Sequence, residues 1–145
     1  MDHKKIAIEN FKKGFNCAQS VFVAFTDVTG MDEAAAAKLS SSFGGGMGGM
    51  KEVCGVLSGA FMVLGIKYGF TEKSSPDEKK AHYARIKSFG DQCTEKYGSL
   101  VCRDLEGWSK ADGFLKGEQD NEFYRTKPCA PYVEYAAELL DEYLK

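Results

Sequence analysis

A chain of 145 residues with 43% hydrophobic content is large enough to bury the core of one compact domain, so a single domain is expected over residues 1–145. Its 19 basic and 21 acidic residues give a net charge of −2, which argues against nucleic acid or an anionic membrane as a partner. The N-terminal segment contains Lys4, Lys5 and Glu9 and lacks the apolar stretch of a signal peptide. The sequence therefore predicts a cytoplasmic protein in which five cysteines do not form a disulfide framework.

Periodicity and capping signals predict three helices in the first part of the chain. Gly14 interrupts the first apolar pattern, and Asn16 restarts it. Asn16 followed by Gln19 is a variant of the capping box, which puts Cys17 in the first turn of the second helix. The three predicted helices cover residues 2–13, 16–28 and 32–43.

The centre of the chain joins a glycine-rich loop to an uncharged segment. Residues 44–49 include five glycines, and the uncharged residues 53–66 follow, with Cys54 near their start. That segment is too short to span a bilayer, which needs roughly 20 residues, so it predicts a buried helix that ends near Tyr68. Small side chains on one side of this helix indicate the close approach of another helix or of a bound group. They belong to Gly55, Ser58, Gly59 and Ala60.

After a polar linker the sequence predicts a long helix and then a short one. Pro76 suits the start of the long helix and Gly98 its end. Ser99 can cap the short helix, which includes Cys102. Apolar residues recur at three and four positions along the long helix and form its core-facing stripe. The stripe consists of Ile86, Phe89, Cys93 and Tyr97.

The last part of the chain predicts a surface excursion and a closing helix. Residues 107–127 have mixed charge and little periodicity and form the excursion, while Pro128 and Pro131 suit a helix entrance. No strand signal competes with the helical patterns. The predicted fold class is therefore all-α, a single-domain bundle of about five to seven helices around the central small-residue helix.

Four cysteines share one position, in or just before the first turn of a predicted helix. A helix N-terminus presents free N–H groups and a partial positive charge, which favour a thiolate. The effect is less than about one and a half pKa units, so complete ionisation of four converging thiols would need more, such as a metal. Cys93, on the stripe of the long helix, is instead expected to pack in the core. The four helix-entrance residues are Cys17, Cys54, Cys102 and Cys129.

The wide spacing of these cysteines leaves no C-x-x-C motif, which removes the usual zinc-ribbon, thioredoxin and c-type haem signatures. Other motifs also fail. Gly44, Gly46 and Gly49 formally satisfy G-x-G-x-x-G, but the preceding segment predicts a helix instead of a strand. Met50 stands where a P-loop needs lysine. His3 lies near a terminus that is expected to fray, and no ligand pattern surrounds it.

Segments around the four cysteines carry a family resemblance. They are NCAQSV at Cys17, FGGGMGG and VCGVLSGAFMVLG at Cys54, VCRDLEG at Cys102, and PCAPYVEYAAELL at Cys129. Together they resemble the C_GCAxxG_C_C family of redox-active proteins, with Val56 where the family name has alanine. The resemblance implies a small prokaryotic protein whose four cysteines are functionally linked.

The same family is similar to split-Soret cytochromes, which carry haem and an iron–sulfur centre. This sequence has no haem-attachment motif, so no haem is expected. The resemblance carries over an iron–sulfur cluster as a candidate cofactor. It does not define an enzymatic activity, because function across the family is poorly defined.

Three functional hypotheses follow from the four-cysteine pattern. In the first, the four cysteines ligate an iron–sulfur cluster or other metal for electron transfer or redox sensing with an unidentified redox partner. The loop backbone at Gly44, Gly45, Gly46, Gly48 and Gly49 would then form a wall of N–H donors. In the second, metal-free thiol–disulfide chemistry uses Cys54 as an accessible attacking thiol with a lowered pKa.

The third hypothesis is a helical interaction or scaffold protein whose cysteines are core residues. The small-residue helix could also pack against its copy in a homodimer. These hypotheses differ in whether the four thiols meet, which the spacing alone does not decide.

Overall fold

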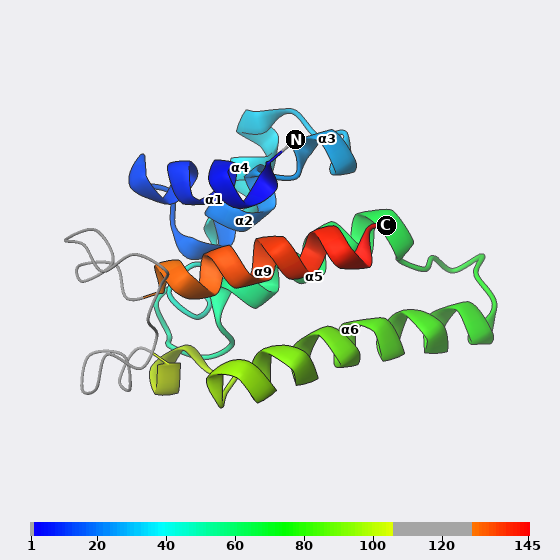
Figure 1. The fold of residues 1–145 in the computed structure, drawn as a ribbon. Coiled ribbons are helices and arrows are strands. Elements are labelled where there is room, and N and C mark those ends of the chain that lie inside the picture. Colours follow the sequence, from blue (N-terminus) through cyan, green and yellow to red (C-terminus); the bar gives the residue numbers. More distant parts are fainter. Residues whose placement is uncertain (1, 106–128) are drawn as a thin grey trace.

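A computed structural model describes residues 2–105 and 129–145 of the chain (Figure 1). Regular structure in these ranges is helical, with one isolated antiparallel bridge, so the all-α prediction is confirmed. The predicted excursion over residues 107–127 lies outside the described residues. A short helical turn covers residues 102–105. The labelled helices are α1 (His3–Lys12), α2 (Cys17–Val23), α3 (Thr26–Thr29), α4 (Glu33–Ser41), α5 (Gly55–Tyr68), α6 (Pro76–Tyr97) and α9 (Ala130–Tyr143).

Helix α5 is the centre of the bundle, as the sequence predicts. In Figure 1, α5 and α9 run between the N-terminal helices α1 to α4 on one side and the long helix α6 on the other. α5 contacts α2, α3, α6 and α9. A helix that touches neighbours on all sides needs apolar or small residues all round, which is the pattern of this segment. Most of its residues from Gly55 to Leu64 are buried.

The small residues of α5 allow α2 to approach it closely. A Cβ atom at Gly59 would lie 2.7 Å from the Ala18 carbonyl oxygen and 3.3 Å from the Val21 Cβ atom. Only a glycine fits at this distance from the backbone of α2. The sequence leaves open whether the small residues of this helix face another helix or a bound group. For Gly59 the structure shows the approach of another helix.

Local capping signals are formed as predicted. The Gln19 N–H donates to the Asn16 side chain at 2.9 Å, and the Asn16 N–H donates to the Gln19 side chain at 3.0 Å. This reciprocal pair is a capping box and fixes the start of α2 at Cys17. At the end of α6, Gly98 has a left-handed conformation with φ of +85°.

The second predicted helix is interrupted, so its expected extent of residues 16–28 is wrong. α2 ends at Val23 and α3 begins at Thr26. Between them Phe25 leaves the helical conformation, with φ of −111° and ψ of 27°. Its buried ring stacks on His3 with the ring centroids 4.0 Å apart. A tertiary contact thus overrides the local helical pattern.

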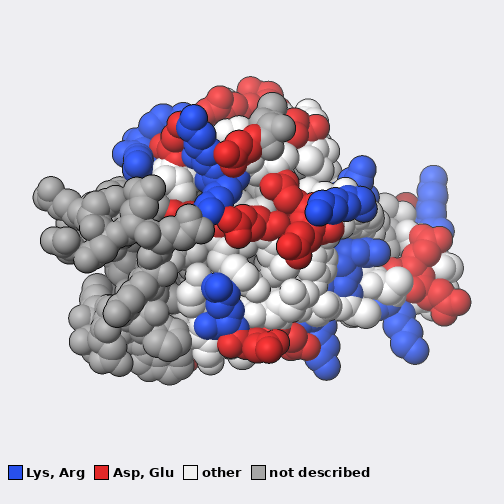
Figure 2. Space-filling model, viewed as in Figure 1, with Lys and Arg blue, Asp and Glu red and all other residues white. Residues whose placement is uncertain are grey.

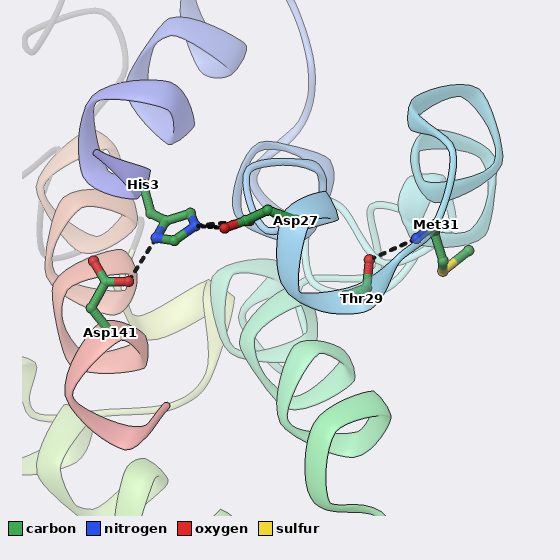
Figure 3. A network of polar contacts seen from close by, with 5 residues as sticks. All are labelled: His3, Asp27, Thr29, Met31 and Asp141. Atoms are coloured by element: carbon green, nitrogen blue, oxygen red, sulfur yellow. Dashed lines mark hydrogen bonds and ion pairs between the residues drawn. The ribbon is translucent and has the colours of Figure 1, made fainter. Parts of the chain in front are cut away.

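His3 joins three helices, contrary to the expectation of a frayed terminus. Its Nδ1 atom lies 2.7 Å from a carboxylate oxygen of Asp141 in α9, and its Nε2 atom lies 2.9 Å from one of Asp27 in α3 (Figure 3). These contacts join the His3 ring to carboxylates of two other helices. With the stacked Phe25 ring, these contacts leave His3 8% exposed. The N-terminal residues are therefore tied to the bundle.

Acidic and basic side chains are interspersed on the face shown in Figure 2. Lys4 of α1 and Glu138 of α9 form one of the ion pairs of the described structure, at 2.6 Å. This distribution agrees with the near-zero net charge of the sequence. Among the described residues, no helix combines the length and the hydrophobicity that crossing a membrane requires.

Candidate functional site

The four cysteines singled out by the sequence all lie at helix entrances. Cys17 is the first residue of α2, and Cys54 and Cys129 are the N-cap residues of α5 and α9. Cys102 begins the helical turn over residues 102–105. The positional prediction is confirmed for each of them. All five cysteines of the chain are thiols and not disulfides.

A short backbone pairing holds Cys54 beside Cys102. Val53 and Val101 form the isolated antiparallel bridge. The Cys54 N–H donates to the Leu100 carbonyl at 2.8 Å, and the Cys102 N–H donates to the Glu52 carbonyl at 2.6 Å. The segments before two helices are thereby aligned, and the helices start next to each other.

Cys17 reaches the same place through the contact between α2 and α5. A Cβ atom at Gly55 would lie 2.6 Å from the Cys17 Sγ atom and 2.8 Å from the Phe43 carbonyl oxygen. The absence of a side chain at Gly55 therefore lets the Cys17 thiol lie against the first turn of α5. Gly55 directly follows Cys54, so the Cys17 thiol lies beside the helix start at which Cys54 is the N-cap.

The pKa of the Cys54 thiol depends on the other three helix-entrance thiols. Burial raises the pKa of the Cys54 thiol well above its usual value, and Cys17 and Cys129 raise it further, with a smaller contribution from Cys102. A hydrogen bond from the Val56 backbone N–H opposes the rise. Three thiols from three other segments are therefore close enough to Cys54 to act on its ionisation.

Cys54 is buried, with 3% of its surface exposed, and its pKa is raised. Both observations contradict the expectation of an accessible thiol with a lowered pKa. The physical reason is that burial, which raises the thiol pKa, outweighs the helix start, which lowers it. In the described structure the Cys54 thiol stays protonated at neutral pH.

The glycine-rich loop turns with a left-handed backbone between these helix entrances. Residues 45–49 all have positive φ, including Met47 at +68°. Glycine adopts this conformation without steric cost, which explains four of the five glycines of the segment, Gly45, Gly46, Gly48 and Gly49. The Lys51 and Glu52 N–H groups donate to the Gly45 and Gly46 carbonyls at 3.0 Å and 2.9 Å.

The loop also touches two of the helix entrances directly. A Cβ atom at Gly44 would collide with the Asn16 side chain, which caps the helix of Cys17. One at Gly46 would lie 2.7 Å from the Cys102 Cβ atom. The Gly49 N–H donates to the Gly44 carbonyl, so this donor of the predicted wall serves the loop itself. Contact of the loop backbone with a bound group stays a prediction.

The donor chemistry and the donor geometry of the four thiols point in different directions for a single metal ion. Thiolates are the soft ligands that zinc and iron–sulfur clusters take. Yet among the residues the structure describes, no three side chains of His, Cys, Asp or Glu are arranged so that they could hold one metal ion. One ion would draw its thiolates to within about 2.3 Å of itself.

Cys93 is buried in the core, away from any helix entrance, as predicted. Burial raises its pKa from 9.0 to about 11, against a small opposing effect of the Tyr132 hydroxyl. Tyr132, in the first turn of α9, is fully buried. Burial raises the pKa of the Tyr132 hydroxyl, and the thiols of Cys93 and Cys54 raise it further by smaller amounts. In the sequence, Tyr132 is indistinguishable from the other residues on the apolar face of the closing helix, so no signal marks it as a site residue.

Alkaline pH is expected to destabilise the reduced, metal-free protein through Cys93. Between about pH 9 and pH 11 the unfolded chain loses the Cys93 proton while the folded chain keeps it, so stability falls as pH rises. A shift of this size corresponds to about 2 to 3 kcal/mol when complete. Urea unfolding at pH 8 and pH 10.5 should show a smaller loss for Cys93→Ala than for the native chain. Equal losses in both proteins would contradict this assignment.

Comparisons with known proteins identify one family. Residues 15–143 match the family model described as "Putative redox-active protein (C_GCAxxG_C_C)". No curated protein matches the chain, and no solved structure matches it. The matched segment spans all four helix-entrance cysteines, the glycine loop and Tyr132.

Proposed function

Because the chain belongs to the C_GCAxxG_C_C family of redox-active proteins, we propose that Cys17, Cys54, Cys102 and Cys129 form a single redox site that binds an iron–sulfur cluster. The site would serve electron transfer or redox sensing. The observation that carries the proposal is geometric: the Val53–Val101 bridge aligns Cys54 with Cys102, and the Cys17 thiol lies against Gly55, the residue after Cys54. Four thiols that gather in this way are a donor set of the kind that iron–sulfur clusters use.

The fit to a cluster follows from the number and the spread of the thiols. In a four-iron cluster each thiolate binds a different iron atom, so the ligand sulfurs stand farther apart than those around one ion. This agrees with thiols that influence each other without forming a single-ion group among the described residues. When bound, an iron–sulfur cluster supplies reversible one-electron transfer.

The chain itself supplies an environment that favours negative charge on these sulfurs. Each thiol lies at a helix entrance, where backbone N–H groups are free to face an anion. At Cys54, the Val56 N–H already favours the thiolate. Burial of Cys54 and Cys102 excludes water from this part of the site. Exclusion of water and N–H donors to sulfur are the means by which a protein sets a cluster potential.

Metal-free thiol–disulfide chemistry is the second candidate. Two observations favour it. The described residues contain no set of three His, Cys, Asp or Glu side chains arranged for a single metal ion, and the Cys17 thiol lies against Gly55, the residue after Cys54. The buried, protonated state of Cys54 opposes it, since attack on a disulfide requires a thiolate. The scaffold hypothesis is weaker, because core packing alone does not explain four thiols at four helix entrances.

The proposal includes the cellular location, the redox partner and the origin of the protein. Five thiols without a disulfide suit a reducing cytoplasm. An electron-transfer role requires a redox partner, which is unidentified. The prokaryotic origin that the family resemblance implies belongs to the same proposal.

Cys54→Ser is expected to abolish cluster binding. Anaerobic purification of the native chain should give brown protein with iron and acid-labile sulfide in stoichiometric amounts. Cys54→Ser should lose most of both, because Cys54 is the thiol on which the other three act. The matched control is Cys93→Ala, which removes a thiol from the core and should keep the native iron and sulfide content.

Two results would count against the proposal. Colourless native protein that stays without iron and sulfide after reconstitution would reject the cluster and favour thiol–disulfide chemistry. Equal iron and sulfide contents in the native chain and in Cys54→Ser would reject Cys54 as a ligand.

A further inference from the structure

The Tyr132 hydroxyl is an unusual polar group in the core of this bundle. Tyr132 is fully buried, and its hydroxyl has no hydrogen-bond partner among the described residues. Burying a hydroxyl without a partner costs free energy, and a phenylalanine would fill the same space without that cost. The hydroxyl is thus a buried donor without a formed hydrogen bond in the described structure.

The hydroxyl lies beside sulfur. The thiols of Cys93 and Cys54 both raise the pKa of Tyr132, after the larger effect of burial. The hydroxyl approaches Cys93 closely enough to lower the pKa of that thiol, but without a well-formed hydrogen bond. Tyr132 is therefore within reach of the region between Cys54 and the core.

The position of the Tyr132 ring is fixed from two sides. Its ring stacks on Tyr97 of α6, with the centroids 4.6 Å apart and the planes inclined by 25°. The Tyr97 hydroxyl in turn donates to the Pro131 carbonyl at 3.2 Å, in the same first turn of α9. The Tyr132 N–H donates to the Cys129 carbonyl at 3.0 Å. Tyr132 is thus anchored to the helix entrance that carries one of the four thiols and cannot turn its hydroxyl to solvent.

We propose that Tyr132 donates its hydroxyl hydrogen to an anionic sulfur acceptor held at the four-thiol site. The acceptor is a cysteine thiolate or an inorganic sulfide, and Tyr132 acts as a positioning residue that stabilises negative charge there. This inference rests on the proposed function, because it requires that the site becomes anionic.

A hydrogen bond to anionic sulfur stabilises the more negative, reduced state and so raises the reduction potential. Tyr132→Phe keeps the ring and removes only the donor, so the midpoint potential should fall. A tenfold change in the equilibrium constant is expected, which is about 59 mV for a one-electron cluster or about 30 mV for a two-electron couple of two thiols and a disulfide. The thermal stability of the metal-free protein should not fall, since no formed hydrogen bond is lost.

Tyr97→Phe is the matched control. It removes a hydroxyl from the same stack, but one that bonds to the Pro131 carbonyl and not to the site. Its melting temperature should fall while its midpoint potential stays at the native value. Placing p-aminophenylalanine at position 132 restores a donor on the same ring and should restore the native potential.

The measurement is a redox titration of the reconstituted protein, followed spectroscopically, and a glutathione titration of the metal-free protein. A shift confined to the reconstituted sample identifies cluster sulfur as the acceptor, and a shift in the thiol couple identifies a thiolate. A native potential in Tyr132→Phe would overturn the role of Tyr132 and leave the proposed function standing. A native chain with neither couple would overturn both.

Discussion

Gly59→Ala is expected to destabilise the protein by about 2 kcal/mol. The new Cβ atom would lie 2.7 Å from the Ala18 carbonyl oxygen and 3.3 Å from the Val21 Cβ atom, so α2 and α5 would have to move apart. Forcing extra atoms into a packed interface costs about 1 to 3 kcal/mol, and more when the obstacle is backbone. The gain in helix propensity, about 1 kcal/mol, offsets only part of this cost. Urea unfolding of the reduced protein measures the difference.

The same helix provides the control. Gly65 also lies within α5, but a Cβ atom there would meet nothing within 4 Å. Gly65→Ala should therefore stabilise the protein by about 0.5 to 1 kcal/mol through propensity alone. The two alanine variants should differ by about 3 kcal/mol, with opposite signs relative to the native chain. Similar effects of both substitutions would show that α2 does not approach α5 at Gly59.

Helix starts could be predicted from the sequence because the signals are local. The capping box at Asn16 and Gln19 needs four consecutive residues, and the observed bonds are those the pattern predicts. The same holds for Gly98 at the end of α6. Three of the four thiols lie in or next to sequence signals for the start of a helix, so their common position at helix entrances was also predictable.

The gathering of the thiols could not be predicted, because it depends on contacts between distant segments. Cys54 and Cys102 are aligned by a single bridge between Val53 and Val101, and one residue pair leaves no alternating strand pattern in the sequence. Cys17 arrives through the packing of α2 on Gly55 of α5. Neither contact has a sequence-local signature.

The lowered Cys54 pKa that the thiol–disulfide hypothesis requires is contradicted for the same reason. The sequence shows the helix entrance, which lowers a thiol pKa, but does not show how deeply the thiol is buried. Burial dominates in the structure, and the neighbouring thiols add to it. The break between α2 and α3 is a similar case, because the stacking of Phe25 on His3 is a tertiary contact.

Gly46→Ala is expected to have the largest effect of the substitutions considered, a loss of about 3 to 4 kcal/mol. Gly46 has φ of +70°, a conformation that costs an L-residue about 1 to 2 kcal/mol. Its Cβ atom would also lie 2.6 Å from the Glu52 backbone nitrogen and 2.7 Å from the Cys102 Cβ atom, which adds an overpacking cost of about 1 to 3 kcal/mol. Denaturant unfolding in the presence of a reductant measures the sum.

Gly49→Ala separates these two costs. Gly49 has φ of +81° in the same loop, but a Cβ atom there would meet nothing within 4 Å, so only the conformational cost of about 1 to 2 kcal/mol is expected. The additional stability loss in Gly46→Ala then measures the contacts of the new Cβ atom with Cys102 and with the backbone nitrogen of Glu52. The Glu52 carbonyl in turn accepts a hydrogen bond from the Cys102 N–H. Because that contact positions one of the four thiols, Gly46→Ala should also lose iron and sulfide on reconstitution, while Gly49→Ala should keep them. Equal stabilities and equal iron contents in the two variants would show that the loop does not position Cys102.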